Sequence, residues 1–347
     1  MKTNINDLVR ENVRLLKPYS SARSEFEGEA EIFLDANESP YGQEFNRYPD
    51  PLQKELKQAI GERLDLPADS LFLGNGSDEA IDLLFRAFCQ PGQDKVLICS
   101  PTYGMYRVSA GINEVEVVDI PLDQDYQPDL PNLQKAMAET SPKLVFLCSP
   151  NNPTGNVMDR NRVEAILESA PGLVILDEAY ADFAPEKSFL NAIDKWPNLV
   201  VLRTFSKAWG LAGIRLGIAA ANPEVIAVLN KIKPPYNLSS PVQQLALKKV
   251  KEGLPSDQVT ELITQKEILA TRLRQNPAVL EVLPSDANFL LVRFRHAGEV
   301  FDRLRGQGTI IRDRRSYVPD GLRITIGTPD ENQTLLNQLD RILTPQA

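Results

Sequence analysis

Histidine, cysteine and basic charge are all scarce in this sequence. Its 347 residues include one histidine and three cysteines. Cys89, Cys99 and Cys148 are odd in number, and their spacing fits neither a zinc knuckle nor a disulfide framework. We therefore predict buried, reduced thiols and no metal site. The single histidine, His296, stands at a predicted strand–helix junction, and we interpret it as structural rather than as an acid–base catalyst.

Long apolar runs and basic runs are also missing. Lys and Arg total 38 against 47 Asp and Glu, a formal net charge of −9, which argues against nucleic acid or anionic membrane as a partner. No uncharged apolar run reaches the roughly 18 residues of a membrane span. The N-terminal residues lack the apolar core of a signal peptide, so we expect a cytoplasmic protein. Any phosphate site must then be built locally, from a few arginines and backbone N–H groups.

What the sequence does contain is a regular alternation of short apolar runs with helical patterns. This alternation indicates βαβ units, hence an α/β fold with a mainly parallel sheet flanked by helices. Near-continuous apolar runs predict strands covered on both faces at Lys95–Ser100, Val115–Asp119, Lys143–Cys148, Leu173–Asp177, Leu199–Arg203 and Leu216–Ala221. Helices are predicted at Leu52–Arg63, Ser77–Phe88 and Arg160–Glu168, with a loop at Lys233–Pro241 and one long helix from Pro241 to about Gln275.

The C-terminal part has a different pattern, typical of a smaller α+β domain. It predicts strands at Phe289–Phe294, Thr309–Asp313 and Leu322–Ile326 and a helix at Ala297–Arg305. Thr328-Pro329-Asp330-Glu331 has the N-cap, the N1 proline and the capping-box glutamate of a last helix. We expect a large domain over residues 46–255 and a small domain over residues 256–347. The N-terminal segment, residues 1–45, is expected to join the small domain, and the long helix is expected to connect the two domains.

The most informative segment for function surrounds Lys207, in the string Arg203-Thr204-Phe205-Ser206-Lys207-Ala208-Trp209-Gly210-Leu211-Ala212-Gly213-Ile214-Arg215. A lysine just beyond the carboxyl end of a strand lies where open α/β sheets bind ligands. The hydroxyls of Thr204 and Ser206 and the guanidinium of Arg215 would converge on an anion. The segment therefore predicts an amine for covalent bonding to a phosphorylated aldehyde, with groups beside it that hold the phosphate.

A second phosphate-binding signal is Leu73-Gly74-Asn75-Gly76-Ser77-Asp78-Glu79, which opens a predicted helix after a short apolar run. The backbone N–H groups of Gly76, Ser77 and Asp78 would hold a phosphate at the positive end of that helix. A dinucleotide-binding interpretation fails, because Glu79 stands where that motif requires glycine.

The string around Lys207 resembles the cofactor-lysine signature of the aspartate-aminotransferase-like, fold type I enzymes. Ser149-Pro150-Asn151-Asn152-Pro153-Thr154-Gly155 and Leu176-Asp177-Glu178-Ala179-Tyr180 resemble two further motifs of that family, in the same order. The resemblance implies pyridoxal 5′-phosphate as the cofactor and Lys207, Asp177 and Tyr180 as the catalytic residues. Asp177 ends a predicted strand, where its carboxylate can reach the cofactor ring nitrogen and keep it protonated. Asn152 and Tyr180 would bind the ring oxygen, and Tyr103 resembles the aromatic residue that stacks on the ring.

The ends of the chain resemble histidinol-phosphate aminotransferases, as in Arg10-Glu11-Asn12-Val13-Arg14, Asn46-Arg47-Tyr48-Pro49-Asp50, Ile310-Ile311-Arg312-Asp313 and Leu322-Arg323-Ile324-Thr325-Ile326-Gly327. This resemblance implies transamination between histidinol phosphate and 2-oxoglutarate, with Lys207 transferring the proton. It also implies one cationic substrate site, to which we assign Tyr19, Asn37, Arg312 and Arg323. Tyr48 resembles a tyrosine that reaches the cofactor phosphate of the neighbouring subunit, so we expect a homodimer.

Three other interpretations stay open at the level of the sequence. A threonine-phosphate decarboxylase shares this scaffold and also handles an amino-acid phosphate. A broad aromatic aminotransferase is a second alternative. A non-catalytic binding protein on the same fold is a third, although a protein that only binds has no use for the amine of Lys207.

Overall fold

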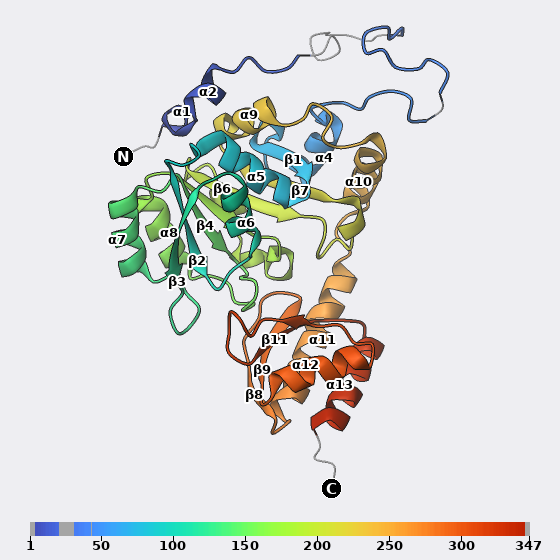
Figure 1. Ribbon diagram of the computed structural model, residues 1–347. Helices are drawn as coiled ribbons and strands as arrows, with labels where there is room; N and C mark the ends of the chain where they lie inside the picture. Colours follow the sequence, from blue (N-terminus) through green and yellow to red (C-terminus); the bar gives the residue numbers. More distant parts are fainter. Residues whose placement is uncertain (1–3, 21–30, 43, 344–347) are drawn as a thin grey trace.

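The computed structural model describes residues 4–20, 31–42 and 44–343. Two units follow one another along the chain, a larger one around a mostly parallel sheet and a smaller one at the C-terminus (Figure 1). Among the described residues, no helix has both the length and the apolar character needed to cross a bilayer.

The large unit is built on a seven-stranded sheet with strand order β1-β7-β6-β5-β4-β2-β3 within the described residues. Strands β2 to β6 run parallel to one another, and β7 is antiparallel to both β1 and β6. The predicted α/β class is therefore confirmed. The strands are β1 (Leu71–Asn75), β2 (Lys95–Ser100), β3 (Glu116–Pro121), β4 (Leu144–Cys148), β5 (Leu173–Asp177), β6 (Leu199–Thr204) and β7 (Leu216–Ala221).

Two apolar cores cover the two faces of this sheet. Successive side chains of a strand point to opposite faces, so Val96 and Ile98 enter one core while Leu97 and Cys99 enter the other. The first face carries α5 (Ser77–Phe88), α6 (Met105–Ile112) and α9 (Pro223–Ile232). The second carries α4 (Lys54–Leu64), α7 (Leu130–Thr140), α8 (Arg160–Ser169) and α10 (Ser240–Glu252). Burial on both faces explains why the strands read as unbroken apolar runs.

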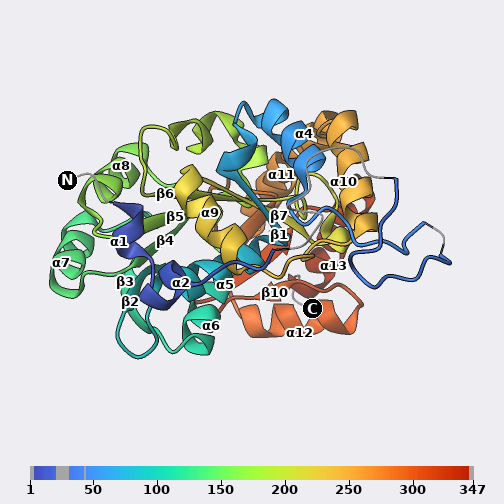
Figure 2. The ribbon, with the colours of Figure 1, turned by 90° about the horizontal axis from the view of Figure 1, so that it is seen from above.

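The N-terminal helices α1 (Ile5–Leu8) and α2 (Glu11–Leu15) belong to the large unit. Ile5, Leu8 and Val13 are buried in the core beneath α5 and α9, and the backbone N–H of Arg10 donates to the carbonyl of Ala87. Figure 2 shows both helices beside α9. The prediction that this segment joins the small domain is wrong for these helices, because their apolar side chains complete the core of the large unit.

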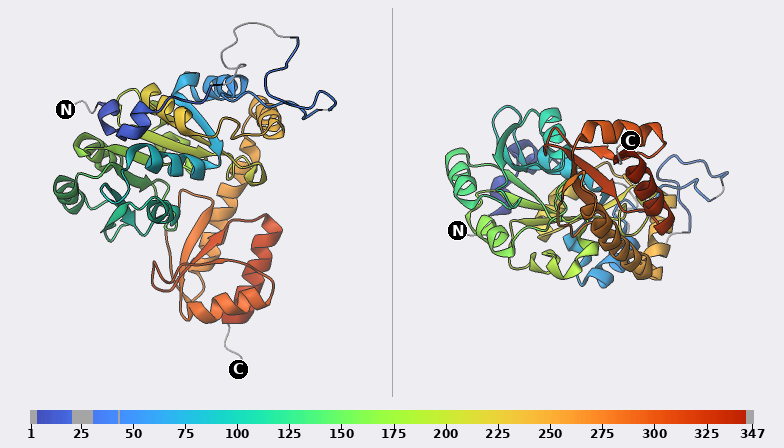
Figure 3. Two further views of the ribbon diagram at one scale, coloured as in Figure 1. Left: turned by 45° about the horizontal axis from the view of Figure 1, so that its top comes forward. Right: turned by 90° about the horizontal axis from the view of Figure 1, so that it is seen from below.

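The small unit is a four-stranded antiparallel sheet, order β10-β11-β9-β8 in the described part of the chain, with helices against it (Figure 3). Its elements are α11 (Ser256–Arg274), β8 (Val279–Val282), β9 (Phe289–Phe294), α12 (Ala297–Gly306), β10 (Arg312–Asp313), β11 (Gly321–Thr325) and α13 (Pro329–Leu343). The predicted capping box of α13 is confirmed: the backbone N–H of Thr328 donates to Glu331 Oε2 at 2.8 Å, and the N–H of Glu331 donates to Thr328 Oγ1 at 3.3 Å.

The structure corrects three further expectations. The single long helix is two helices, α10 and α11, because Gly253 adopts φ +95° and is followed by Leu254 and Pro255. The expected strand at Thr309–Asp313 is reduced to β10, and β8 was not expected at all. Short 3₁₀ turns complete the chain at η1 (Ala68–Ser70), η2 (Ala181–Phe183), η3 (Pro185–Lys187), η4 (Leu190–Ala192) and η5 (Ala212–Ile214).

Candidate active site

A cavity of about 420 Å³ lies where the carboxyl ends of the parallel strands meet the start of α5 and the edge of the small unit. Parallel strands end on one edge of their sheet, so residues far apart in the sequence converge there. The predicted residues that line it are Ser77, Asp78, Tyr103, Asn152, Asp177, Tyr180, Thr204, Ser206, Lys207, Arg215, Arg312 and Arg323.

Asp177 is the deepest acid of the cavity. It ends β5 and is only 3% exposed, and its carboxylate accepts hydrogen bonds from the Tyr106 hydroxyl at 2.7 Å and the Ala179 N–H at 3.1 Å. Burial raises the pKa of Asp177 to about 6, although both hydrogen bonds lower it. Such a carboxylate binds a cationic ring nitrogen well, since pairing relieves the cost of the buried charge. Tyr106, fully buried on α6, was not expected from the sequence.

Lys207 opens into the same cavity, just after β6. Its Nζ lies 5.5 Å from the ring centroid of Tyr180. Partial burial lowers the pKa of Lys207, and the nearby charge of Arg323 lowers it further. A lowered pKa increases the fraction of neutral amine, the form that attacks an aldehyde and accepts a proton.

A short chain of hydrogen bonds links the two units across the cavity. Arg323 on β11 donates to Asn152 Oδ1 at 2.5 Å, and Asn152 Nδ2 donates to the Tyr180 hydroxyl at 3.4 Å. Asn152 and Tyr180 are both buried. The large unit therefore orients Arg323 of the small unit.

The other end of the cavity fits a phosphate group. The start of α5 offers backbone N–H groups, and Ser206 Oγ lies between Thr204 Oγ1 at 3.1 Å and Arg215 Nη1 at 3.4 Å. A Cβ on Gly76 would stand 2.6 Å from Arg215 Nη2. A Cβ on Gly217 would stand 2.1 Å from the backbone nitrogen of Ser77, so glycine is required for β7 to approach the helix start.

Tyr103 stands at one wall of the cavity, after the cis Ser100–Pro101 peptide. Its hydroxyl donates to Asp78 Oδ1 at 3.2 Å, and its ring makes an edge-to-face contact with Tyr106 at 5.6 Å between centroids. Burial, followed by the charge of Asp78, raises the pKa of Tyr103 above its ordinary value, so the hydroxyl stays protonated near neutral pH.

The small unit contributes three arginines to the opposite wall. Arg312 and Arg323 were expected from the sequence, but Arg314 was not. With Lys207 and Arg215 the cavity holds five cationic side chains, against the carboxylates of Asp78 and Asp177. The repeated arginines of Arg312-Asp313-Arg314-Arg315 could have signalled a third one, but only the tertiary structure shows which of them face inward.

Gly76 directly precedes the lining residue Ser77, but three other predicted residues lie in separate cavities within the single chain. Tyr48 stacks on Tyr236 with ring centroids 4.3 Å apart, and with Asn37 it lines a separate cavity of about 420 Å³. Tyr19, which is 71% exposed, lines another cavity of about 480 Å³. Figure 1 shows residues 31–42 on the side of the large unit opposite the small unit. One chain therefore does not bring these residues to Lys207.

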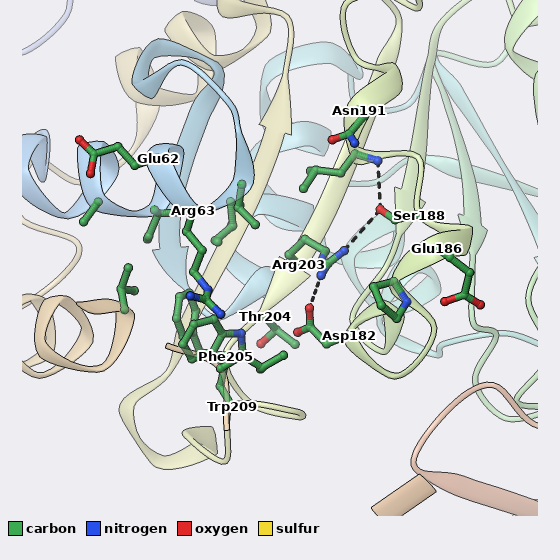
Figure 4. A pocket seen from close by; sticks show the side chains of 18 of the residues that line it. Glu62, Arg63, Asp182, Glu186, Ser188, Asn191, Arg203, Thr204, Phe205 and Trp209 are labelled. Carbon is green, nitrogen blue, oxygen red and sulfur yellow. Dashed lines mark hydrogen bonds and ion pairs between the residues drawn. The ribbon is translucent and has the colours of Figure 1, made fainter. Parts of the chain in front are cut away.

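A larger cavity of about 1060 Å³ lies near the other side of Thr204, between α4, α10 and the η2–η4 region (Figure 4). Its most buried charge, Arg203, is already paired with Asp182 and Glu178 and donates to Ser188 Oγ at 3.4 Å. The larger volume of this cavity therefore does not make it the better candidate for the active site. The smaller one holds the amine of Lys207, the carboxylate of Asp177 and a cluster of four arginines.

Comparison with known proteins agrees with this geometry. Residues 29–339 match the family model for aminotransferase class I and II. The chain belongs to this aminotransferase family. It is 47% identical over 346 residues to a histidinol-phosphate aminotransferase of Cytophaga hutchinsonii, covering 98% of this chain and 99% of that protein. It is 49% identical over 339 residues to one of Parabacteroides distasonis, covering 97% and 98%.

A solved structure of an aminotransferase shares the fold. Histidinol-phosphate aminotransferase from Sinorhizobium meliloti, in complex with pyridoxal-5′-phosphate, superposes with a TM-score of 0.78 at 25% identity and 89% coverage of both chains. The predicted fold type I class is therefore confirmed.

Proposed function

We propose that this chain is a pyridoxal-phosphate-dependent histidinol-phosphate aminotransferase. The reaction transfers an amino group from histidinol phosphate to 2-oxoglutarate, giving imidazole-acetol phosphate and glutamate. The observation that carries the proposal is the composition of the cavity: Lys207 and Asp177 stand beside a phosphate-binding end, and a separate arginine cluster forms the opposite wall. The relatives at 47% and 49% identity support the same substrates.

The residues of the cavity fit the cofactor. Ser77, Thr204, Ser206 and Arg215 would hold its phosphate together with the N–H groups around Gly76 and Asp78. Asp177 would pair with its ring nitrogen, Asn152 and Tyr180 would bind its ring oxygen, and Tyr103 would pack against its ring. When bound, the cofactor supplies an electron sink for the charge left on the substrate carbon.

Lys207 would carry out the proton transfer. Its lowered pKa favours the neutral amine, which accepts a proton at Nζ from the substrate carbon that bears the amino group. The same Nζ would then deliver this proton to the cofactor carbon that takes over the amino nitrogen, and not back to the substrate carbon. During this step Asn152, Tyr180 and Asp177 would hold the cofactor ring and polarise it. Their burial would keep bulk water away from the proton transfer.

The arginine wall would serve both substrates in turn. Histidinol phosphate presents a phosphate ester there, and glutamate presents its α-carboxylate in the other half-reaction. Arg323, oriented by Asn152, and Arg312 supply charged donors for either anion.

We also propose a homodimer in which Tyr48, with Tyr19 and Asn37, completes the site of the neighbouring subunit. Support comes from the position of these residues away from Lys207 in their own chain. The test is to form hybrid dimers from Tyr48→Ala and Lys207→Ala chains. If Tyr48 acts in the partner, each hybrid contains one intact site and activity returns, whereas action within its own chain leaves the hybrid as inactive as its parents.

Domain division and location complete the proposal. The large domain would extend over residues 46–255 and the small one over 256–347, with α10 and α11 meeting at the boundary. Cys89, Cys99 and Cys148 are free and buried, and burial raises the pKa of Cys89 to about 12. Inert thiols of this kind suit the reducing cytoplasm, where we place the protein.

The deciding experiment adds histidinol phosphate to the purified holoenzyme and follows cofactor absorbance. We expect conversion from the aldehyde form to the amine form, and reversal by 2-oxoglutarate. Lys207→Ala should abolish the conversion, whereas Lys195→Ala, which changes an exposed lysine, should leave it intact. Release of carbon dioxide from threonine phosphate without this conversion would instead assign a decarboxylase. Efficient conversion by tyrosine or phenylalanine alone would assign an aromatic aminotransferase.

A further inference from the structure

Arg314 is held at the wall of the active-site cavity by its own backbone. Its N–H donates to the carbonyl of Gly321 at 3.0 Å, and its carbonyl accepts from the N–H groups of Tyr317 and Val318, each at 2.9 Å. These bonds close the turn between β10 and β11 and leave little freedom to the backbone that carries the side chain. The guanidinium is therefore directed by a fixed turn and not by a loose loop.

The guanidinium of Arg314 has no acidic partner among the described residues. Its Nε is buried and makes no hydrogen bond there, and the same is true of the Nε of Arg323. Its neighbour Arg315 differs completely, because Nε and Nη2 donate to the Asp313 carboxylate at 3.0 Å, 3.1 Å and 2.7 Å. Of two adjacent arginines, Arg315 pairs with a carboxylate, whereas Arg314 lines the cavity with its guanidinium carbon 5.7 Å from the ring centroid of Tyr317.

This arrangement is electrostatically unfavourable in the chain alone. Burial lowers the pKa of Arg314, and the charges of Arg323 and Arg312 lower it further. Among the described residues no carboxylate forms an ion pair with any of these three guanidinium groups, which indicates a site for an anion of more than one charge. Arg314 also lies near Tyr180 and so faces the reactive part of the cavity: burial raises the pKa of Tyr180, and the charges of Arg323 and Arg314 oppose that rise.

The two substrates differ in what they can offer to a third arginine. The α-carboxylate of glutamate has one negative charge and two oxygens, which Arg323 and Arg312 can bind between them; the second carboxylate of glutamate is separated from it by three carbons. A phosphate monoester has three terminal oxygens and a charge of about −1.5 to −2 at neutral pH. At this end of the substrate, a third guanidinium has a free oxygen and a second charge to bind only in the phosphate complex.

We propose that Arg314 is a specificity-determining residue that binds the third oxygen of a dianionic phosphate ester and contributes little to carboxylate binding. The proposal rests on the proposed function, since it assigns the phosphate half-reaction to this cavity. It explains how one cationic site distinguishes a phosphorylated amine from an ordinary amino acid.

The test compares Arg314→Gln with the matched control Arg315→Gln in single-turnover measurements on the holoenzyme. For Arg314→Gln we expect kcat/KM with histidinol phosphate to fall about 10- to 100-fold, and kcat/KM with glutamate to change less than about threefold. Arg315→Gln should leave both values near wild type. Arg314→Lys keeps the positive charge but lacks the planar guanidinium that donates two parallel hydrogen bonds, so it should recover part of the loss. Equal losses in both half-reactions, or equal behaviour of the two Gln variants, would overturn the proposal.

Two further readouts separate this role from a structural one. The rise of kcat/KM with pH through the second phosphate ionisation, near pH 6, should be smaller in Arg314→Gln, because that variant loses its preference for the dianion. Inorganic phosphate should compete with glutamate in the wild-type holoenzyme and compete about tenfold less well in Arg314→Gln. The phosphate assay does not use histidinol phosphate. If that substrate is not converted by the wild type, the proposed function fails while Arg314 is still tested.

Discussion

The hydrogen bond from Tyr106 to Asp177 leads to a prediction that can be worked through from the structure. Tyr106→Phe removes the hydroxyl that donates to Asp177 Oδ2 at 2.7 Å and keeps the ring stacked on Phe146, with centroids 4.7 Å apart. Among the described residues, the Ala179 N–H is then the remaining hydrogen-bond donor to this carboxylate. The charged form of Asp177 loses stabilisation, so its pKa must rise above about 6.

The size of the rise follows from the strength of the bond. A hydrogen bond to a charged group contributes about 1.5–3 kcal/mol, and one pKa unit corresponds to about 1.36 kcal/mol, so the pKa should rise by about one to two units. At pH 7 the carboxylate of the cofactor-free variant then changes from mostly ionised to mostly neutral. Cofactor affinity should fall about 2- to 15-fold at pH 7, because the ionised fraction that binds the ring nitrogen falls by that factor. At pH 9 the Asp177 carboxylate is ionised in both proteins, so the difference in cofactor affinity should vanish.

The same shift has a defined sign for stability. The pKa of Asp177 is about 6 in the folded, cofactor-free chain, against 3.8 for the unfolded value. The native state therefore binds a proton below pH 6 that the unfolded state binds only below about pH 4. This group favours unfolding above pH 6, and the penalty disappears as the pH falls to about 4. In Tyr106→Phe the penalty should begin to disappear at higher pH.

Equilibrium dialysis of the cofactor at pH 6, 7 and 9 measures the fall in cofactor affinity. Urea unfolding of the cofactor-free chain across pH measures the change in the pH dependence of stability. Tyr126→Phe serves as the control, because the Tyr126 side chain is away from Asp177 and packs beside Leu283 and Val318. Cofactor affinity that falls equally at every pH would refute the argument, since it would mean that the hydroxyl acts on packing and not on the ionisation of Asp177.

Two stability predictions concern the framework around the site. Arg203→Met should lower the free energy of unfolding by about 3–5 kcal/mol in urea, because it leaves the buried carboxylate of Glu178 and the partly buried one of Asp182 without their ion-pair partner, whereas Arg293→Met at an exposed pair should cost less than about 1 kcal/mol. A loss below about 1 kcal/mol in the first variant would contradict the buried-pair argument. Gly217→Ala places a Cβ 2.1 Å from the backbone of the α5 start, so it should cost at least about 1–3 kcal/mol and weaken cofactor binding. Gly306→Ala, with nothing within 4 Å, is its control, and similar melting temperatures for the two would disprove the close-approach argument.

The sequence by itself determined the local elements of the large unit and several of the residues that meet in its cavity. Strands β2, β5 and β7 and helix α5 occur at the expected residues, because apolar runs buried on two faces and a helix start have strong local patterns. Lys207, Asp177 and Asn152 could be brought into one site from the sequence, because each follows a parallel strand and such strands end on one edge.

Tertiary structure alone decided which distant surfaces meet. Whether α1 packs on the large or the small unit depends on apolar contacts with residues more than 70 positions away, for which the local pattern carries no signal. The inward direction of Arg314 and the outward direction of Arg315 depend on the turn closed by Gly321. Tyr106 reaches Asp177 only because α6 packs beneath β4 and β5. Periodicity shows which residues are buried, but it does not show what they touch, since contact depends on the packing of the whole chain.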